Sequence, residues 1–172
     1  MNPPDAWSSL DVLVRASARG SSPGGVAERL LEARRMVEVG AVQLAAVRRS
    51  AEHLEQMRAC IAEMLAASVE GDVDLFVEAD MAFHDTIMRA SGNVFVPFLL
   101  EPFGALLVEA RRQTSAVPQI QRNAIAEHER IVDAVRGGDP ERARDAMESH
   151  MAQTQADLRV HVLGAERAEE RA

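Results

Sequence analysis

An aspartate and a histidine four positions apart, Asp80 and His84, are the residues with the clearest potential for chemistry. They lie in the stretch DMAFHDTIMRASGN, which runs from Asp80 to Asn93. Residues four apart share one face of an α-helix, so both side chains can point at a common atom. Phe83 and Ile87 predict that this helix is amphipathic. Taken alone, the pair is either an ordinary surface ion pair or part of a binding site.

Two further histidines are predicted to face the protein interior. His128 is followed by three apolar residues at helical spacing, and His150 shares a helical stripe with two methionines and a leucine. His161 is expected on the same face as His150 but roughly 16 Å along the helix, too far to join one site. His53 falls in the first turn of its helix and is expected at the surface.

These inward residues suggest a metal site. Unpaired imidazoles in an apolar interior are costly, and one divalent cation would satisfy three of them together with a carboxylate. Three nitrogens and one oxygen favour Zn, Ni, Mn or Fe(II) over Ca or Mg. The alternative is a set of hydrogen-bonded core histidines without metal. The predicted ligands are Asp80, His84, His128 and His150.

Arg34 lies on the apolar stripe of the first long helical segment, between Leu30 and Val37. A guanidinium on an inward face needs a partner. That partner is either a protein carboxylate such as Glu38 or an anionic ligand held in a fork. If Arg34 faces the metal cavity, the cavity suits a carboxylate.

Composition narrows the class of protein. The chain has 172 residues, the size of one domain, and a net charge of −8 with scattered arginines, so it should repel nucleic acid. Its single cysteine, Cys60, excludes an intramolecular disulfide and a thiolate zinc site. We recognise neither a signal peptide nor a membrane-spanning run, and expect a soluble, cytoplasmic chain without membrane contact.

Hydrophobic periodicity and capping residues predict an all-α antiparallel bundle of six to seven helices. Residues 1–25 are expected to form a short helix at 7–18 and a Ser/Gly/Pro linker without a DNA-binding module. Residues 26–165 form the predicted ligand-binding domain, and 166–172 a charged tail. The predicted helices of that domain are 27–49, 51–68, a helix that begins at Asp72 or Asp74 and ends at 90, 94–113 (kinked or divided at Pro102), 119–136 and 140–165.

Four spaced motifs resemble a known family. They are L-x-E-A-R-R-x-V-E at 30–38, D-x-x-F-H-x-x-I-x-x-A-S-G-N at 80–93, E-H-x-x-I-x-x-A-V at 127–135 and G-D-x-x-x-A-x-x-A-M-x-x-H at 138–150. Together they resemble the FCD domain, the C-terminal effector-binding domain of the FadR subgroup of GntR-type bacterial transcription regulators.

The resemblance implies a helical bundle that encloses a metal, commonly zinc or nickel, and a small organic carboxylate such as lactate, gluconate or citrate. Its metal ligands correspond to the four residues predicted above, and Arg34 corresponds to a contact with the effector carboxylate. We expect a homodimer. The family's winged helix-turn-helix is not recognisable before the first bundle helix, so DNA contact is expected only through such a missing module.

Three functions remain to be compared. The first is a metal-dependent sensor of a small carboxylate. The second is a metal-dependent enzyme that acts on a small organic acid, but we find no Glu-x-x-His pair and no spare general base, and expect no enzyme. The third is a structural dimerisation module.

Overall fold

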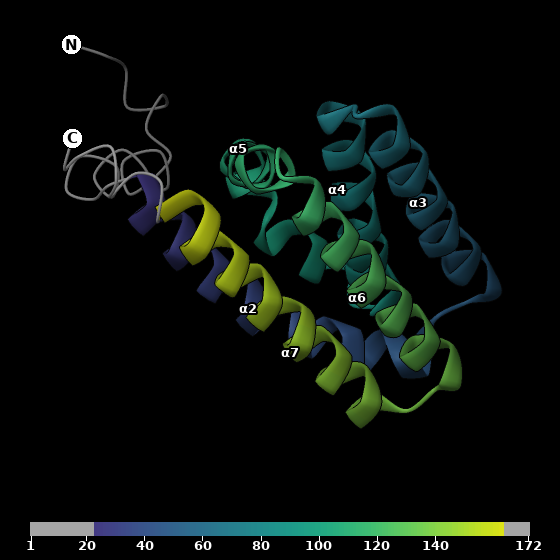
Figure 1. Cartoon of the computed structure of the whole chain (residues 1–172). Helices are drawn as coiled ribbons and strands as arrows, with labels where there is room; N and C mark the ends of the chain where they lie inside the picture. Colours follow the sequence, from purple (N-terminus) through teal and green to yellow (C-terminus); the bar gives the residue numbers. More distant parts are fainter. Residues whose placement is uncertain (1–22, 164–172) are drawn as a thin grey trace, which may run out of the picture.

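The computed structural model describes residues 23–163, which contain six α-helices and no strand (Figure 1). This confirms the predicted all-α bundle of six to seven helices. The expected helix at 7–18 and the tail at 166–172 lie outside the described residues. The helices are α2 (Pro23–Arg48), α3 (Ala51–Glu70), α4 (Val73–Ala90), α5 (Gly104–Ser115), α6 (Pro118–Gly137) and α7 (Pro140–Asp157), and a π-helical segment, η4 (Leu158–Leu163), follows α7.

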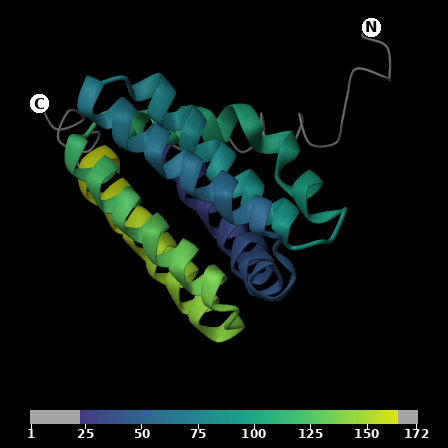
Figure 2. The same ribbon diagram turned by 90° about the vertical axis from the view of Figure 1, so that its right-hand side faces the viewer.

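Two helical hairpins have the same Gly–Asp connection. Gly71 after α3 and Gly138 after α6 have φ angles of 73° and 74°, the left-handed conformation that favours glycine at a helix C-terminus. Asp72 and Asp139 then cap α4 and α7, since each side chain accepts a hydrogen bond from a first-turn backbone N–H. These tight turns place α3 beside α4 and α6 beside α7 (Figures 1 and 2).

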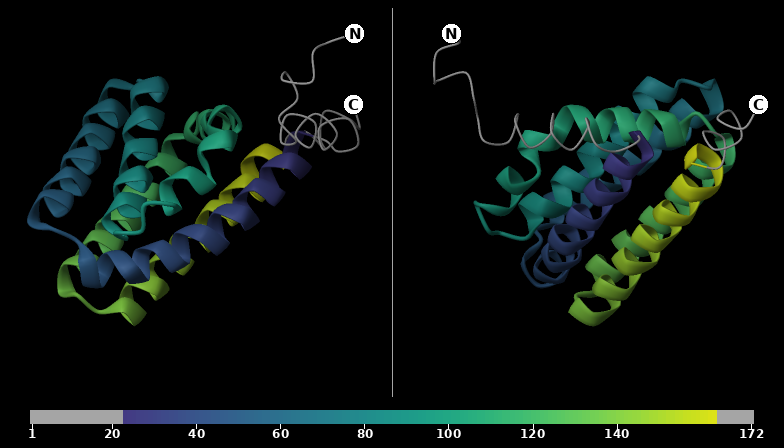
Figure 3. Two further views of the ribbon diagram at one scale, coloured as in Figure 1. Left: turned by 180° about the vertical axis from the view of Figure 1, so that it is seen from behind. Right: turned by 90° about the vertical axis from the view of Figure 1, so that its left-hand side faces the viewer.

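Helix α2 joins the two hairpins. It packs along α7 and also contacts α4 and α6, as the views from behind and from the side show (Figure 3). The core between these helices consists of aliphatic, methionine and phenylalanine side chains. Its largest fully buried members are Val42, Met57, Met64, Phe76, Phe83, Ile87, Ile131, Val135, Met147 and Met151. The inward faces of α2, α4, α6 and α7 therefore meet in one interior.

The segment between α4 and α5 differs from the prediction. Instead of one helix over 94–113, it forms two 3₁₀ turns, η2 (Val96–Leu99) and η3 (Glu101–Phe103), before α5 begins at Gly104. Each turn has a proline in its first two positions, Pro97 and Pro102. Because proline lacks the N–H of the i→i−4 ladder, two so close together prevent a continuous α-helix. The α-helical part of the predicted segment is therefore limited to α5, and Pro102 lies in the 3₁₀ turn directly before it.

No helix within residues 23–163 combines the length and the hydropathy that crossing a membrane requires.

Candidate metal centre and adjoining cavity

Three helices bring three histidines together in the interior. His84 comes from the middle of α4, His128 from α6 and His150 from α7, and all three are buried. One ring nitrogen of each lies within 4.8 Å of a ring nitrogen of the others. Their ring centroids are 4.7 to 5.2 Å apart. The helical spacing in the sequence had predicted this convergence.

Asp80 lies beside the three histidines, one turn before His84 on α4. Its Oδ1 is 3.5 Å from Nε2 of His128 and 3.9 Å from Nε2 of His84. Its Oδ2 forms an ion pair with Nη1 of Arg111 on α5. All four predicted metal-binding residues therefore occupy one region, with the carboxylate engaged by an arginine.

Several imidazole nitrogens of this group have no hydrogen-bond partner among the described residues, so their lone pairs are free to bind a metal. Within the described part of the chain, both ring nitrogens of His128 and Nε2 of His150 are buried without a hydrogen-bond partner. Buried polar atoms are almost always paired, because an unpaired one costs free energy. A divalent cation accepts such lone pairs directly, and three imidazoles with one carboxylate are an established zinc-type donor set. The residues therefore fit a transition metal.

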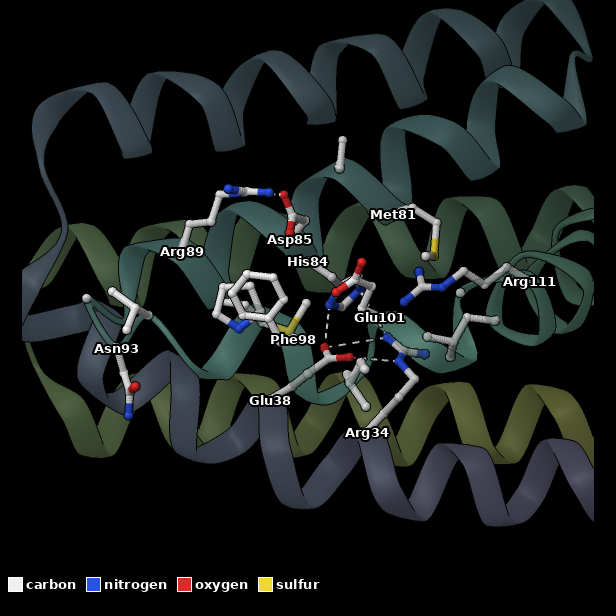
Figure 4. A pocket seen from close by; sticks show the side chains of 18 residues that line it. Arg34, Glu38, Met81, His84, Asp85, Arg89, Asn93, Phe98, Glu101 and Arg111 are labelled. Carbon is white, nitrogen blue, oxygen red and sulfur yellow. Dashed lines mark hydrogen bonds and ion pairs between the residues drawn. The ribbon is translucent and has the colours of Figure 1, made fainter. Parts of the chain in front are cut away.

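An ion-pair network from α2 holds the ring of His84. Glu38 Oε2 lies 2.5 Å from Nδ1 of His84, and Glu38 Oε1 accepts a 2.8 Å hydrogen bond from Nε of Arg34. Nη2 of Arg34 is 3.4 Å from Nε2 of His84 (Figure 4). The carboxylate at Nδ1 places the proton there and leaves Nε2 with its lone pair, the arrangement found around metal-bound histidines.

Burial and these ion pairs shift the pKa values of the site. Burial lowers the pKa of His84, and the Glu38 carboxylate raises it only in part. Burial, with the neighbouring cations, holds the pKa values of His128 and His150 well below the usual range, so both rings are neutral at pH 7. Burial raises the pKa of Glu38, but Arg34 and His84 outweigh it and hold that pKa well below its usual value.

Phe83 fixes the orientation of His128. The two rings are stacked, with centroids 4.3 Å apart and planes 28° apart, and both side chains are fully buried. Phe83 is also the residue before His84 on α4. One aromatic side chain thus links the helix that carries Asp80 and His84 to the helix that carries His128.

A cavity of about 770 Å³ adjoins the site (Figure 4). Residues of α2, α4, η2, η3 and α5 line it, and His84 is the member of the histidine group that reaches its wall. Arg34, Glu38 and Arg111 are its buried charged residues. The site therefore has an interior cluster of donors and, on the side of His84, room for a small molecule.

Sequence reasoning did not identify Arg111. Its helical neighbours Leu107 and Thr114 are also buried, so it lies on the inward stripe of α5. That spacing was a usable signal. Sequence reasoning named Glu38 as one of two alternative partners of Arg34. It did not identify the second contact of Glu38, which is with His84.

The two remaining histidines lie outside the site, as expected. His53 caps the first turn of α3 together with Ser50, and His161 is exposed.

Comparison with known proteins gives a consistent family. The family described as "FCD domain" matches residues 29–153. The chain is 35% identical over 130 residues to the HTH-type transcriptional regulator LutR of Bacillus subtilis. The aligned region covers 72% of this chain and 58% of LutR. It is 30% identical over 136 residues to the HTH-type transcriptional repressor NanR of Cronobacter sakazakii. Here the aligned region covers 76% of this chain and 50% of NanR.

Solved structures show the same fold. The metal-free FCD domain of TM0439 superposes with a TM-score of 0.59 at 19% identity, over 82% of this chain and 99% of that one. E. coli McbR/YncC superposes with a TM-score of 0.64 at 21% identity, over 76% of this chain and 66% of that one.

The chain spans about half of the length of the curated relatives that it matches, 58% of LutR and 50% of NanR. These relatives are named as regulators of transcription, which agrees with the expectation that the chain is not an enzyme. On the family match, the fold and these relatives, the chain belongs to the FCD family of effector domains of GntR-type transcription regulators.

Proposed function

We propose that this chain is a metal-dependent sensor domain that binds a small organic carboxylate. Asp80, His84, His128 and His150 hold one divalent transition metal, and the acid occupies the adjoining cavity in contact with the metal. The binding event in turn selects one arrangement of a regulator dimer. Binding energy that differs between two arrangements is what allows a ligand to shift their populations.

The observation that carries this proposal is the group of buried histidine nitrogens without partners. Three imidazoles from three helices converge within 4.8 Å and share no hydrogen bond with one another. A purely structural core would place apolar side chains or hydrogen-bonded pairs there. The donor set favours Zn or Ni, and Mn or Fe are also compatible with it. The name of one solved FCD structure specifies that it is metal-free, which makes metal a relevant variable for that domain.

The carboxylate part of the proposal depends on Arg34. This residue is 4% exposed, lies in the cavity wall and shares a single carboxylate, Glu38, with His84. A guanidinium has five N–H donors, and the carboxylate of Glu38 is shared between Arg34 and His84. Arg34 therefore keeps N–H donors for an anion in the cavity. A metal with an open position next to a guanidinium is a suitable receptor for a carboxylate.

We further propose that the domain acts as a homodimer in the cytoplasm and reaches DNA only through a winged helix-turn-helix. The net charge of −8 opposes direct contact with phosphates. The relatives named as HTH-type regulators support a role in transcription.

The test is a pair of binding measurements on the purified chain. Elemental analysis and metal titration should give one Zn or Ni per chain, and calorimetry should detect small carboxylates only after metal loading. His128→Ala should weaken metal and acid binding together, whereas His161→Ala, at an exposed position, serves as the control. Acid binding that survives complete metal removal undiminished would exclude the proposal.

A further inference from the structure

Arg111 is a buried cation whose role is not explained by packing. Its side chain is about nine-tenths buried, lines the cavity and points toward Arg34 (Figure 4). Its Nη1 pairs with Asp80, while its Nε is buried without a hydrogen-bond partner in the described residues. A guanidinium has five N–H donors, so the single carboxylate of Asp80 satisfies only part of it.

Asp80 is the carboxylate for which a metal and Arg111 compete. A divalent cation held by the three histidines would attract the Asp80 carboxylate more strongly than a single guanidinium does. Arg111 would then lose the one carboxylate with which it pairs in the described part of the chain, while it stays in a buried position. An unpaired buried charge is strongly unfavourable, so the metal-loaded site needs a new anion beside Arg111.

The charges of the site lead to the same requirement. Without metal, Arg34 balances Glu38 and Arg111 balances Asp80. Asp85 and Arg89, also in the cavity wall, pair with each other at 2.6 Å. A divalent cation adds two positive charges, and Glu38, the buried carboxylate among the described residues of the cavity wall, is already paired with Arg34.

Glu101 does not change this balance. It is the other acidic residue of the cavity wall, but it is exposed to solvent, which screens its charge.

We infer that the acid sensed by this domain carries two carboxylates, and that Arg111 together with Arg34 binds the second of them once the metal has taken Asp80. The inference rests on the proposed function and specifies its ligand class. One carboxylate completes the metal, and the other lies between the two guanidiniums. Arg34 is 3.4 Å from the ring of His84, Arg111 contacts Asp80, and both arginines line the same cavity.

The first experiment compares matched acids on the full chain loaded with Zn or Ni. L-malate is compared with L-lactate, and succinate with propionate, by isothermal titration calorimetry. Each charge-assisted contact adds enough binding free energy for a dicarboxylate to bind at least about tenfold more tightly than its monocarboxylate partner. Equal affinity within each pair would overturn the inference.

The second experiment removes the cation. Arg111→Gln should abolish the preference for the dicarboxylate, leave monocarboxylate affinity within about threefold, and leave metal affinity unchanged or higher, because the competitor for Asp80 is gone. Arg111→Lys keeps the charge but not the fork and should keep part of the preference. Arg112→Gln is the matched control, since Arg112 is the next residue of α5, is exposed and pairs with Asp74 outside the cavity.

The outcomes distinguish a failure of the proposed function from a failure of the role assigned to Arg111. If neither class of acid binds the metal-loaded chain, the proposed function fails and the inference fails with it. If acids bind but Arg111→Gln leaves the dicarboxylate preference intact, or if that variant binds metal more weakly than the parent chain, only the role of Arg111 fails. Circular dichroism of each variant identifies any loss of the helical fold, and Arg111→Lys then decides the role of the guanidinium.

Discussion

Glu38 and His84 form a direct contact between α2 and α4, with Oε2 of the glutamate 2.5 Å from Nδ1 of the histidine. Both side chains are almost completely buried, and Arg34 holds the opposite oxygen of the same carboxylate. The contact fixes which nitrogen of His84 carries the proton and how its ring is turned. Residues of this kind tune a metal site without touching the metal.

Replacing this carboxylate should weaken metal binding. Glu38→Gln removes the charge that holds the Nδ1 proton, and we expect metal affinity to fall by about 10- to 100-fold. Competition titration with a metal chelator measures the change. Glu32→Gln is the matched control, since Glu32 is an exposed residue of the same helix. A Glu38→Gln chain with the parent's metal affinity would rule out this role.

The metal-free chain should lose stability as pH falls through the histidine range. Burial lowers the pKa values of His128 and His150 in the folded chain, whereas in the unfolded chain both titrate near 6.5. Below that pH the unfolded chain binds more protons, so the free energy of unfolding decreases by up to about 1.4 kcal/mol per pH unit for each ring. Above it, this contribution is fully present.

Urea unfolding of the metal-free chain at a series of pH values between about 5 and 7.5 measures this slope. The variant His150→Leu has one titrating ring fewer and should show a shallower profile. A profile as steep as the parent's in that variant would contradict the assignment of the slope to these rings.

The stack of Phe83 on His128 can be separated from ordinary core packing. Phe83→Leu and Phe76→Leu each shorten a fully buried side chain of α4, and each should cost about 1–2 kcal/mol of unfolding free energy. Of these two phenylalanines, Phe83 is the one whose ring stacks on His128. We therefore expect Phe83→Leu, but not Phe76→Leu, to lower metal affinity as well. Metal titration measures this affinity, and equal values in the two variants would refute the role of the stack.

Metal should also stabilise the fold. A ligand that binds only the folded chain adds about 2.7 kcal/mol at a free concentration 100 times its Kd. Thermal unfolding followed by circular dichroism should thus shift upward with Zn or Ni and return on addition of a chelator. The double variant His128→Ala with His150→Ala should show no shift, and a shift equal to the parent's there would place the metal elsewhere.

Local signals predicted much of the fold. The caps at Asp72 and Asp139 follow from the chemistry of single residues and their neighbours. The segment 94–103 was less predictable, because two prolines can be accommodated in a kinked helix or in 3₁₀ turns, and packing against α4 decides between them.

The site was predictable to the extent that helical faces define it. His84, His128 and His150 each lie on an apolar stripe, so their convergence follows from a bundle that has one interior. The partners of the charged groups depend on how helices are placed relative to one another. The pairing of Arg111 with Asp80 requires the exact start of α5, and the contact of Glu38 with His84 requires the register of α2 against α4; periodicity specifies neither.

The three histidines are far apart along the chain, and this separation has a topological consequence. His84 and His150 differ by 66 positions, and His128 lies between them. An ion bound to all three would close two loops at once and join α4, α6 and α7 as a covalent cross-link does, which reduces the conformational entropy of any partly unfolded chain that keeps the ion.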